Sequence, residues 1–156
     1  MARIETYRDQ YRADFERLNR DWIETFFVLE DADREIFRDP DTAVIGPGGQ
    51  IFFVVDEDGV QGTCAVVPHE PGIFEIAKMA VSAGARGRGY GDLLMEASVE
   101  FARRVGARRV LIVSNTVLAP AIRLYQKHGF VQVPLDEHER FARANIRLER
   151  ELPAGA

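Results

Sequence analysis

Residues 86–91 read Arg86-Gly87-Arg88-Gly89-Tyr90-Gly91, and this glycine-rich stretch joins two runs of different periodicity. Residues 73–81 are apolar and strand-like, whereas residues 92–105 have the spacing of an amphipathic helix. Glycine leaves no Cβ between the backbone amides and a ligand, and the first turn of a helix offers unpaired N–H groups at the positive end of its dipole. The two arginines add positive charge. The stretch therefore predicts a site for a phosphate-bearing ligand.

Two familiar phosphate-binding loops do not fit these residues. The dinucleotide fingerprint needs a third glycine where Asp92 stands, and the ATP-binding loop needs Gly-Lys-Ser/Thr, which the sequence lacks. The pattern that fits is Arg-x-x-Gly-x-Gly at residues 86–91, preceded by Lys78-Met79-Ala80-Val81. For a lone loop of this kind, a connector without any ligand is the plain alternative.

A second motif occupies residues 114–130. Residues 110–113 predict a buried strand, Pro120 suits the first turn of a short helix, and Gly129 ends that helix. Tyr125 falls on the apolar face of this helix, so core packing alone could explain it.

The two motifs together resemble the coenzyme A site of the GNAT superfamily of N-acetyltransferases. The resemblance implies that residues 86–91 hold the pyrophosphate and that Tyr125 meets the coenzyme sulfur as the acid for the leaving thiolate. Asn115, at a strand end, either hydrogen-bonds the cofactor or caps the strand. The expected cofactor-binding residues are Met79, Ala80, Val81, Arg86, Gly87, Arg88, Gly89, Tyr90, Gly91, Asn115 and Tyr125.

Glu75 is the candidate catalytic base. It lies eleven residues before Arg86, the offset at which histone acetyltransferases of this superfamily place their catalytic glutamate. A lysine-like amine costs about 4 to 5 kcal/mol to neutralise at about pH 7, so a base is useful. Period two puts Glu75 on one face of its strand with Ala77, Met79 and Val81. The alternative is a structural ion pair with a neighbouring arginine.

The acceptor pocket is expected between the first two helices and the segment before the last strand, as the resemblance implies. The side chains expected around the amine are Trp22, Phe26, Glu30 and Phe141. Residues 1–60 carry 15 acidic and 7 basic side chains, net −8, which favours a cationic acceptor. For Trp22 and Phe26 the alternative is that they complete an apolar helix face.

The fold class expected is α/β (α+β), with a GNAT fold in which a central mixed twisted β-sheet of about seven strands is flanked by four helices. A single N-acetyltransferase domain would span residues 1–156. Strands are expected at residues 3–7, 51–55, 63–67, 73–81, 110–113, 131–133 and 144–150. Helices are expected at residues 11–26, 31–38 and 92–105, and a short one from about Pro120 that Gly129 ends.

Composition sets limits on the other classes of function. The 156 residues are 46% hydrophobic and 29% charged, which is typical of a soluble globular protein. We find no apolar run of about 18 residues and no signal peptide, so we expect a cytoplasmic protein without a membrane partner. The net charge of −5 disfavours nucleic acid. Cys64 is expected to be a buried, inert thiol, and His69, His128 and His138 lack metal-ligand spacing, so no metal is expected.

The functional prediction is acetyl-CoA-dependent transfer of an acetyl group directly to a primary amine. That amine could belong to a small amine, an amino acid, or a peptide or protein. Residues 18–23, 29–36 and 143–146 resemble a group of small bacterial GNAT proteins whose substrates are mostly unassigned. A catalytically silent CoA-binding sensor or partner-binding module is the main alternative, and a nucleotide-binding domain is the weaker one. A homodimer is expected by analogy alone.

Overall fold

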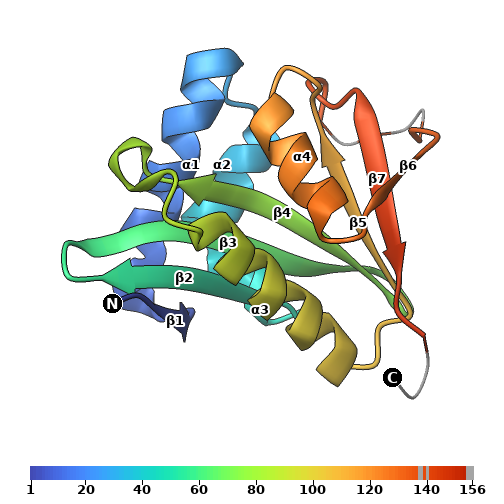
Figure 1. The fold of residues 1–156 in the computed structure, drawn as a ribbon, viewed down its shortest axis with the longest axis horizontal. Coiled ribbons are helices and arrows are strands. Elements are labelled where there is room, and N and C mark those ends of the chain that lie inside the picture. Colours follow the sequence, from blue (N-terminus) through green and yellow to red (C-terminus); the bar gives the residue numbers. More distant parts are fainter. Residues whose placement is uncertain (137–138, 140, 154–156) are drawn as a thin grey trace.

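The computed structural model describes residues 1–136, 139 and 141–153. They build one seven-stranded mixed sheet in the order β1-β2-β3-β4-β5-β7-β6 (Figure 1). The strands are β1 (Arg3–Thr6), β2 (Gln50–Asp56), β3 (Gly59–Glu70), β4 (Ile73–Val81), β5 (Arg109–Ser114), β6 (Val131–Val133) and β7 (Ile146–Glu151). The α-helices are α1 (Arg12–Phe26), α2 (Asp31–Arg38), α3 (Tyr90–Arg104) and α4 (Ala119–Lys127).

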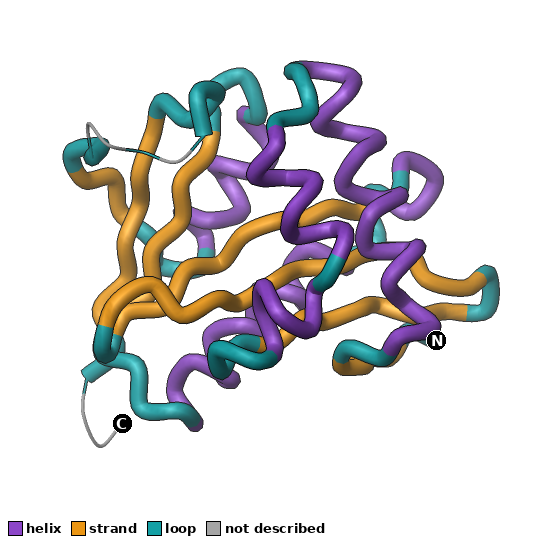
Figure 2. Tube along the Cα trace, turned by 180° about the vertical axis from the view of Figure 1, so that it is seen from behind, coloured by secondary structure: helices purple, strands orange, loops and turns teal. Residues whose placement is uncertain are grey.

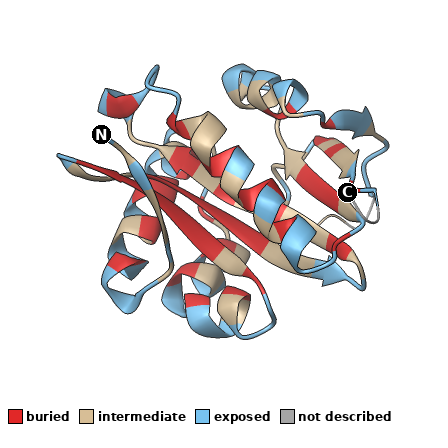
Figure 3. Ribbon diagram, turned by 60° about the horizontal axis from the view of Figure 1, so that its bottom comes forward, coloured by how far each residue is buried: buried red, intermediate tan, exposed pale blue. Residues whose placement is uncertain are grey.

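The four helices form two layers around the sheet. Helices α1 and α2 lie on one face and α3 and α4 on the other, as the two opposite views show (Figures 1 and 2). Buried residues follow the central strands and the inward sides of the helices (Figure 3). On α1, for example, Phe15, Leu18 and Ile23 are buried while Glu16, Arg20 and Glu24 form surface ion pairs. The helical period of the apolar residues thus places each helix against the sheet.

The contact between β4 and β5 is short. These parallel strands pair only from Ile73 opposite Arg109 to Glu75 opposite Leu111. Beyond Glu75 they diverge, which Figure 1 shows as the widening space between β4 and β5. The β5-facing edge of β4 from Ile76 onward therefore has no strand partner, and its backbone groups need other acceptors and donors.

A β-bulge interrupts β4 at Lys78. Thr63 pairs with Ala80 and Ala65 with Ala77, so one extra residue of β4 lies between these pairs. Lys78 has a φ of 56°, the one left-handed non-glycine residue in the described part of the chain. The prediction that strict alternation places Glu75, Ala77, Met79 and Val81 on one face is therefore wrong. Met79 and Val81 pack against the core under α3, whereas Lys78 turns toward α2.

Most predicted elements agree with this structure. The sheet of seven strands and the four α-helices are confirmed, and the predicted bounds of α2 and β4 are the observed ones. The final strand, β7, enters the sheet between β5 and β6, which no local pattern indicated. No helix of residues 1–136 or 141–153 is both long and apolar enough to cross a membrane.

Candidate active site

The space between β4 and β5 opens into a cavity of about 370 Å³. Its walls come from segments far apart in sequence: the end of α1, the second half of β4, the end of β5, helix α4 and the segment before β7. The volume is in the range of small-molecule sites. Of the predicted residues, those lining it are Trp22, Phe26, Glu75, Met79, Ala80, Val81, Arg86, Gly91, Asn115, Tyr125 and Phe141.

The glycine-rich loop forms one end of the site. Gly87 and Gly89 have φ values of 82° and 80°, and a Cβ built on either would meet no atom within 4 Å. Gly89 is the N-cap of α3. None of the hydrogen bonds between described residues uses a backbone N–H of residues 87–92. The loop therefore presents a row of open amides at a helix N-terminus, which is the geometry that binds an anion.

The side chains of Arg88 and Tyr90 turn away from the cavity. The Tyr90 hydroxyl donates to Asp56 Oδ2 at 2.7 Å, and Arg88 Nη1 lies 3.2 Å from the same oxygen. Neither residue lines the cavity, and neither do Gly87 and Gly89. The expectation that both arginines add charge beside the amides is thus corrected: Arg86 lines the cavity, whereas Arg88 ties the loop to β2.

Tyr125 lies on α4 and, like Glu75, lines the cavity. It is 7% exposed, and within the described residues its hydroxyl has no hydrogen-bond partner. Burial raises the pKa of Tyr125 well above its usual value of 10.0. The hydroxyl therefore keeps its proton near neutral pH and can act as a hydrogen-bond donor.

Asn115 uses its side chain within the protein. Its Nδ2 donates to the Arg143 carbonyl at 2.7 Å, and its Oδ1 accepts from the Val117 amide at 2.9 Å. These bonds favour the strand-end cap over direct cofactor binding. They also fasten the segment before β7 to the end of β5.

Glu75 stands where β4 and β5 part. Its side chain is 23% exposed and lines the cavity, and its Oε1 lies 3.9 Å from His69 Nδ1 on β3. A carboxylate at the apex of the opening can reach both the cavity and a histidine that is open to solvent.

Aromatic rings surround the far end of the cavity. Trp22, Phe26, Phe27 and Phe141 all line it. Phe26 is 51% exposed, so it is not packed into the core beneath α1. The Trp22 indole N–H donates to Asn19 Oδ1 at 3.0 Å, and Asn19 is fully buried. Asn19 thus orients Trp22, a role that the sequence pattern did not indicate.

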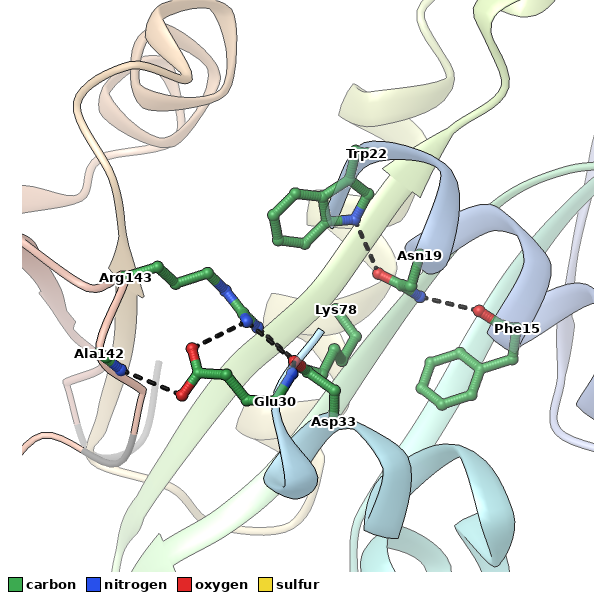
Figure 4. A network of polar contacts seen from close by, with 8 residues as sticks. All are labelled: Phe15, Asn19, Trp22, Glu30, Asp33, Lys78, Ala142 and Arg143. Atoms are coloured by element: carbon green, nitrogen blue, oxygen red, sulfur yellow. Dashed lines mark hydrogen bonds and ion pairs between the residues drawn. The ribbon is translucent and has the colours of Figure 1, made fainter. Parts of the chain in front are cut away.

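Glu30 does not line the cavity but lies behind its wall. Its carboxylate accepts from the Ala142 amide and from Arg143, both at 3.2 Å. Arg143 also makes a two-pronged contact with Asp33, at 2.8 and 2.6 Å, and Lys78 Nζ lies 2.5 Å from Asp33 Oδ1 (Figure 4). Glu30, predicted to lie near the acceptor amine, thus contacts residues of the cavity wall and does not line the cavity itself.

This buried network was not foreseen from the sequence. Burial alone would raise the pKa of Asp33, but the hydrogen bonds from Arg143 and the charge of Lys78 outweigh it and hold that pKa far below its usual value. Burial lowers the pKa of Lys78 to about 8, against the opposing effect of Asp33. The Lys78 ammonium also lies 4.1 Å from the ring centre of Phe141. The network thus joins α2, the bulge of β4 and the segment before β7.

The other chemically active residues lie apart from this cavity. Cys64 is buried, and burial raises its pKa to about 12, as expected for an unreactive thiol. His128 lies 2.8 Å from Asp92, and His138 is outside the described residues. Among the residues that the structure describes, no three His, Cys, Asp or Glu side chains cluster as metal ligands would.

Comparison with known proteins now identifies the family. The sequence profile of the Acetyltransferase (GNAT) family matches residues 5–130. The chain is 34% identical over 80 residues to a mycothiol acetyltransferase of Corynebacterium glutamicum, a match that covers 51% of this chain and 27% of that protein. It is 39% identical over 61 residues to the streptothricin acetyltransferase of Streptomyces lavendulae, covering 39% and 32%. These two matches span about a third or less of the relatives' own length. Because the family profile covers most of the chain, the chain belongs to the GNAT family.

Solved structures share the fold over nearly the whole chain. A GNAT-family acetyltransferase of Staphylococcus aureus superimposes with a TM-score of 0.89 at 14% identity, covering 98% of this chain and all of that one. A phosphinothricin acetyltransferase of Sinorhizobium meliloti, in complex with AcCoA, gives 0.78 at 19% identity, covering 97% and 88%. The GNAT fold predicted from the sequence is confirmed.

The Asp33 network predicts a specific loss of stability in acid. Because the folded pKa of Asp33 lies below its unfolded value of about 3.9, its contribution is complete above that value, declines as the pH falls below it, and is fully lost only below the folded pKa. Asp33→Asn should lower the free energy of unfolding by about 3 kcal/mol near neutral pH. The difference from wild type should shrink on acidification to about pH 3.

Urea unfolding at several pH values measures this difference. Asp31→Asn is the matched control, since Asp31 lies in the same helix with a side chain that is 96% exposed. Its substitution should change stability by less than about 0.5 kcal/mol at every pH. A deficit for Asp33→Asn that is independent of pH would contradict the assignment.

Proposed function

We propose that this protein is an acetyl-CoA-dependent N-acetyltransferase that moves an acetyl group directly to a primary amine. The single observation that carries the proposal is the cavity between the diverging strands β4 and β5. It is lined by Arg86 and Gly91 of the loop with open amides, by the rings of Trp22, Phe26 and Phe141, and by Glu75 and Tyr125.

The loop end suits the pyrophosphate of coenzyme A. The amides of residues 87–92 and the positive end of the α3 dipole would bind it, and Arg86 would add charge. The unpaired edge of β4 beyond Glu75 offers backbone N–H and C=O groups to an amide-bearing arm such as pantetheine. Met79, Ala80 and Val81 lie on this edge and line the cavity. The residues present thus fit the cofactor along its length.

The middle of the cavity suits acetyl transfer. In that reaction the amine nitrogen forms a bond to the acetyl carbon, the carbon–sulfur bond breaks, and the amine loses a proton. Glu75 would accept that proton, and His69, 3.9 Å away, leads toward solvent. Tyr125 would donate to the sulfur as it leaves, because its raised pKa keeps its hydroxyl protonated.

The acceptor end favours a cationic amine with an apolar body. Asp21, Glu75, Lys78 and Arg143 all line the cavity, and Glu30 and Asp33 lie behind its wall, where they bind Arg143 and Lys78. Two cations against four carboxylates give a net charge of −2. The rings of Trp22, Phe26 and Phe141 suit an alkyl or aryl group beside the cation. The names of the relatives refer to mycothiol and to streptothricin, so family membership leaves the acceptor open.

Thiol release from acetyl-CoA with a panel of amines tests the proposal. The panel should hold 2-phenylethylamine, lysine, glutamate and a peptide with a free N-terminus. We expect release with at least one amine and the highest kcat/KM with an amine that is cationic and apolar. Tight CoA binding without release for any amine would favour the silent CoA-binding module instead.

Gly89 tests the cofactor loop. Gly89→Val places a branched side chain in the space before the open amides, so the Kd of CoA measured by calorimetry should rise about tenfold or more. Gly106→Val is the matched control, because Gly106 flanks the other end of α3 with a φ of 82° and equally open surroundings. Both variants bear the same backbone strain, and equal CoA affinity in the two would remove the basis for the loop assignment.

Tyr125→Phe keeps the ring and removes the proton donor. Turnover in single-turnover assays should fall by about 10² or more, with CoA affinity little changed. Tyr7→Phe is the control, since the Tyr7 hydroxyl is buried without a hydrogen-bond partner in the described structure. Tyr7 packs against the buried residues on the α1 and α2 side of the sheet, such as Phe15 and Phe37. An unchanged rate for Tyr125→Phe would make Tyr125 a packing residue.

Glu75→Gln keeps the shape and removes the base. Its rate deficit should be about 10²-fold near neutral pH and should shrink toward about pH 9.5, where more of the amine is already neutral. Glu70→Gln serves as the control, because Glu70 also lies beside His69 but its side chain is 60% exposed. A deficit that stays constant between these pH values would assign Glu75 a positioning role.

A further inference from the structure

Two buried aspartates stand behind the two ends of the active-site cavity. Asp56 and Asp33 have side chains with no exposed surface, and neither lines the cavity. Each is bound by a set of side chains and amides that lead to one end of the site. We propose that Asp56 and Asp33 are positioning residues that separately set the cofactor loop and the acceptor wall. The inference rests on the proposed acetyl transfer.

Asp56, at the end of β2, holds the second half of the glycine-rich loop. Its Oδ2 accepts from the Tyr90 hydroxyl at 2.7 Å and from Arg88 at 3.2 Å. These two residues flank Gly89, the N-cap of α3. The hydrogen bond from Tyr90 lowers the pKa of Asp56, so the carboxylate stays charged at neutral pH. Fixing both neighbours of Gly89 fixes the amides at the start of α3.

The same aspartate also reaches Ser82, which follows β4 and precedes the loop. Its Oδ1 accepts from the Asp58 amide at 2.9 Å and from Gln61 Nε2 at 3.2 Å. Gln61 in turn accepts from the Ser82 hydroxyl at 2.5 Å, and its carbonyl accepts from the Ser82 amide at 2.8 Å. Side chains of the β2–β3 hairpin therefore bind Ser82 ahead of the loop and Arg88 and Tyr90 within it. A row of amides held in this way loses little entropy when it binds an anion.

Asp33, on α2, does the same for the acceptor end. It accepts from Arg143 at 2.8 and 2.6 Å, from Lys78 at 2.5 Å and from the Glu30 amide at 2.9 Å. Arg143 stacks within 4.5 Å of the Phe141 ring and 5.6 Å of the Trp22 ring. Figure 4 shows Arg143 and Lys78 reaching Asp33 from opposite sides. Asp33 thus sets the distance between the bulge of β4 and the aromatic wall before β7.

The two clusters are separate in composition. Within the part of the chain that the structure describes, no residue bonded to Asp56 is bonded to Asp33, and the clusters come from different elements. Substitutions without shared partners have additive effects. Loss of one carboxylate should therefore weaken the binding of one substrate and leave the binding of the other unchanged. A general loss of stability would affect the binding of both.

The test measures the Kd of CoA and the KM of both substrates for the Asp56→Asn and Asp33→Asn variants. Asp56→Asn should raise the Kd of CoA and the KM of acetyl-CoA by about 10- to 100-fold. The acceptor KM, measured with the most active amine of the panel, should stay within about twofold. Asp33→Asn should do the reverse, raising the acceptor KM about 10- to 100-fold and leaving the CoA Kd within about twofold. The double variant should show both effects.

Two milder substitutions keep the test decisive if either asparagine variant does not fold. Arg88→Gln removes one partner of Asp56 at a side chain that is 47% exposed, and Arg143→Lys keeps the charge beside Asp33 but loses the two-pronged contact. Each should show the same split at reduced size. Equal changes in the KM of acetyl-CoA and the KM of the acceptor, or no change in either, would overturn the inference. The CoA Kd is measured without turnover, so wild-type protein that binds CoA and releases no thiol would refute the proposed function alone.

Discussion

The early separation of β4 from β5 is the constraint on which the rest of the structure depends. Three residue pairs join these strands, and the sheet then splits while both helix layers remain packed against it. A fully paired sheet would fill the same space with backbone hydrogen bonds and side chains. The split leaves unpaired backbone on β4, a cavity floored by Glu75, and room for α4 to bring in Tyr125.

Polar side-chain contacts stabilise both strands where they separate, on the β4 side through Lys78 and on the β5 side through Asn115. A bulge with a left-handed lysine and a buried cluster of charges each cost free energy, and they persist where surrounding contacts over-determine them. Lys78 supplies both features at once, since the bulge turns its ammonium to Asp33. Asn115 ties the other arm, through the Arg143 carbonyl, to the same segment before β7. The segment before β7, which lines the cavity, is thus bonded to residues of both flanking arms.

Local patterns predicted what local physics decides. The bounds of β4 follow from its apolar run, and the end of α2 follows from Asp39-Pro40, since a residue before proline disfavours the helical conformation. The start of α3 lies at Tyr90, two residues before the predicted Asp92, because Gly89 serves as a left-handed N-cap. Long-range partners were beyond such patterns. Lys78 and Arg143 follow Asp33 in the sequence by 45 and 110 residues, respectively. Nothing in this spacing marks the three residues as one network. The same holds for Arg88 and Tyr90, whose motif positions gave no sign that Asp56 binds their side chains.

Hydrogen exchange with and without CoA tests most directly that the split sheet and the glycine-rich loop form one cofactor site. The account predicts that saturating CoA slows amide exchange at least about tenfold at residues 87–92 and along the unpaired edge of β4, while exchange in β1 and β2 stays unchanged. Protection confined to other elements, or no protection despite saturating CoA, would contradict it.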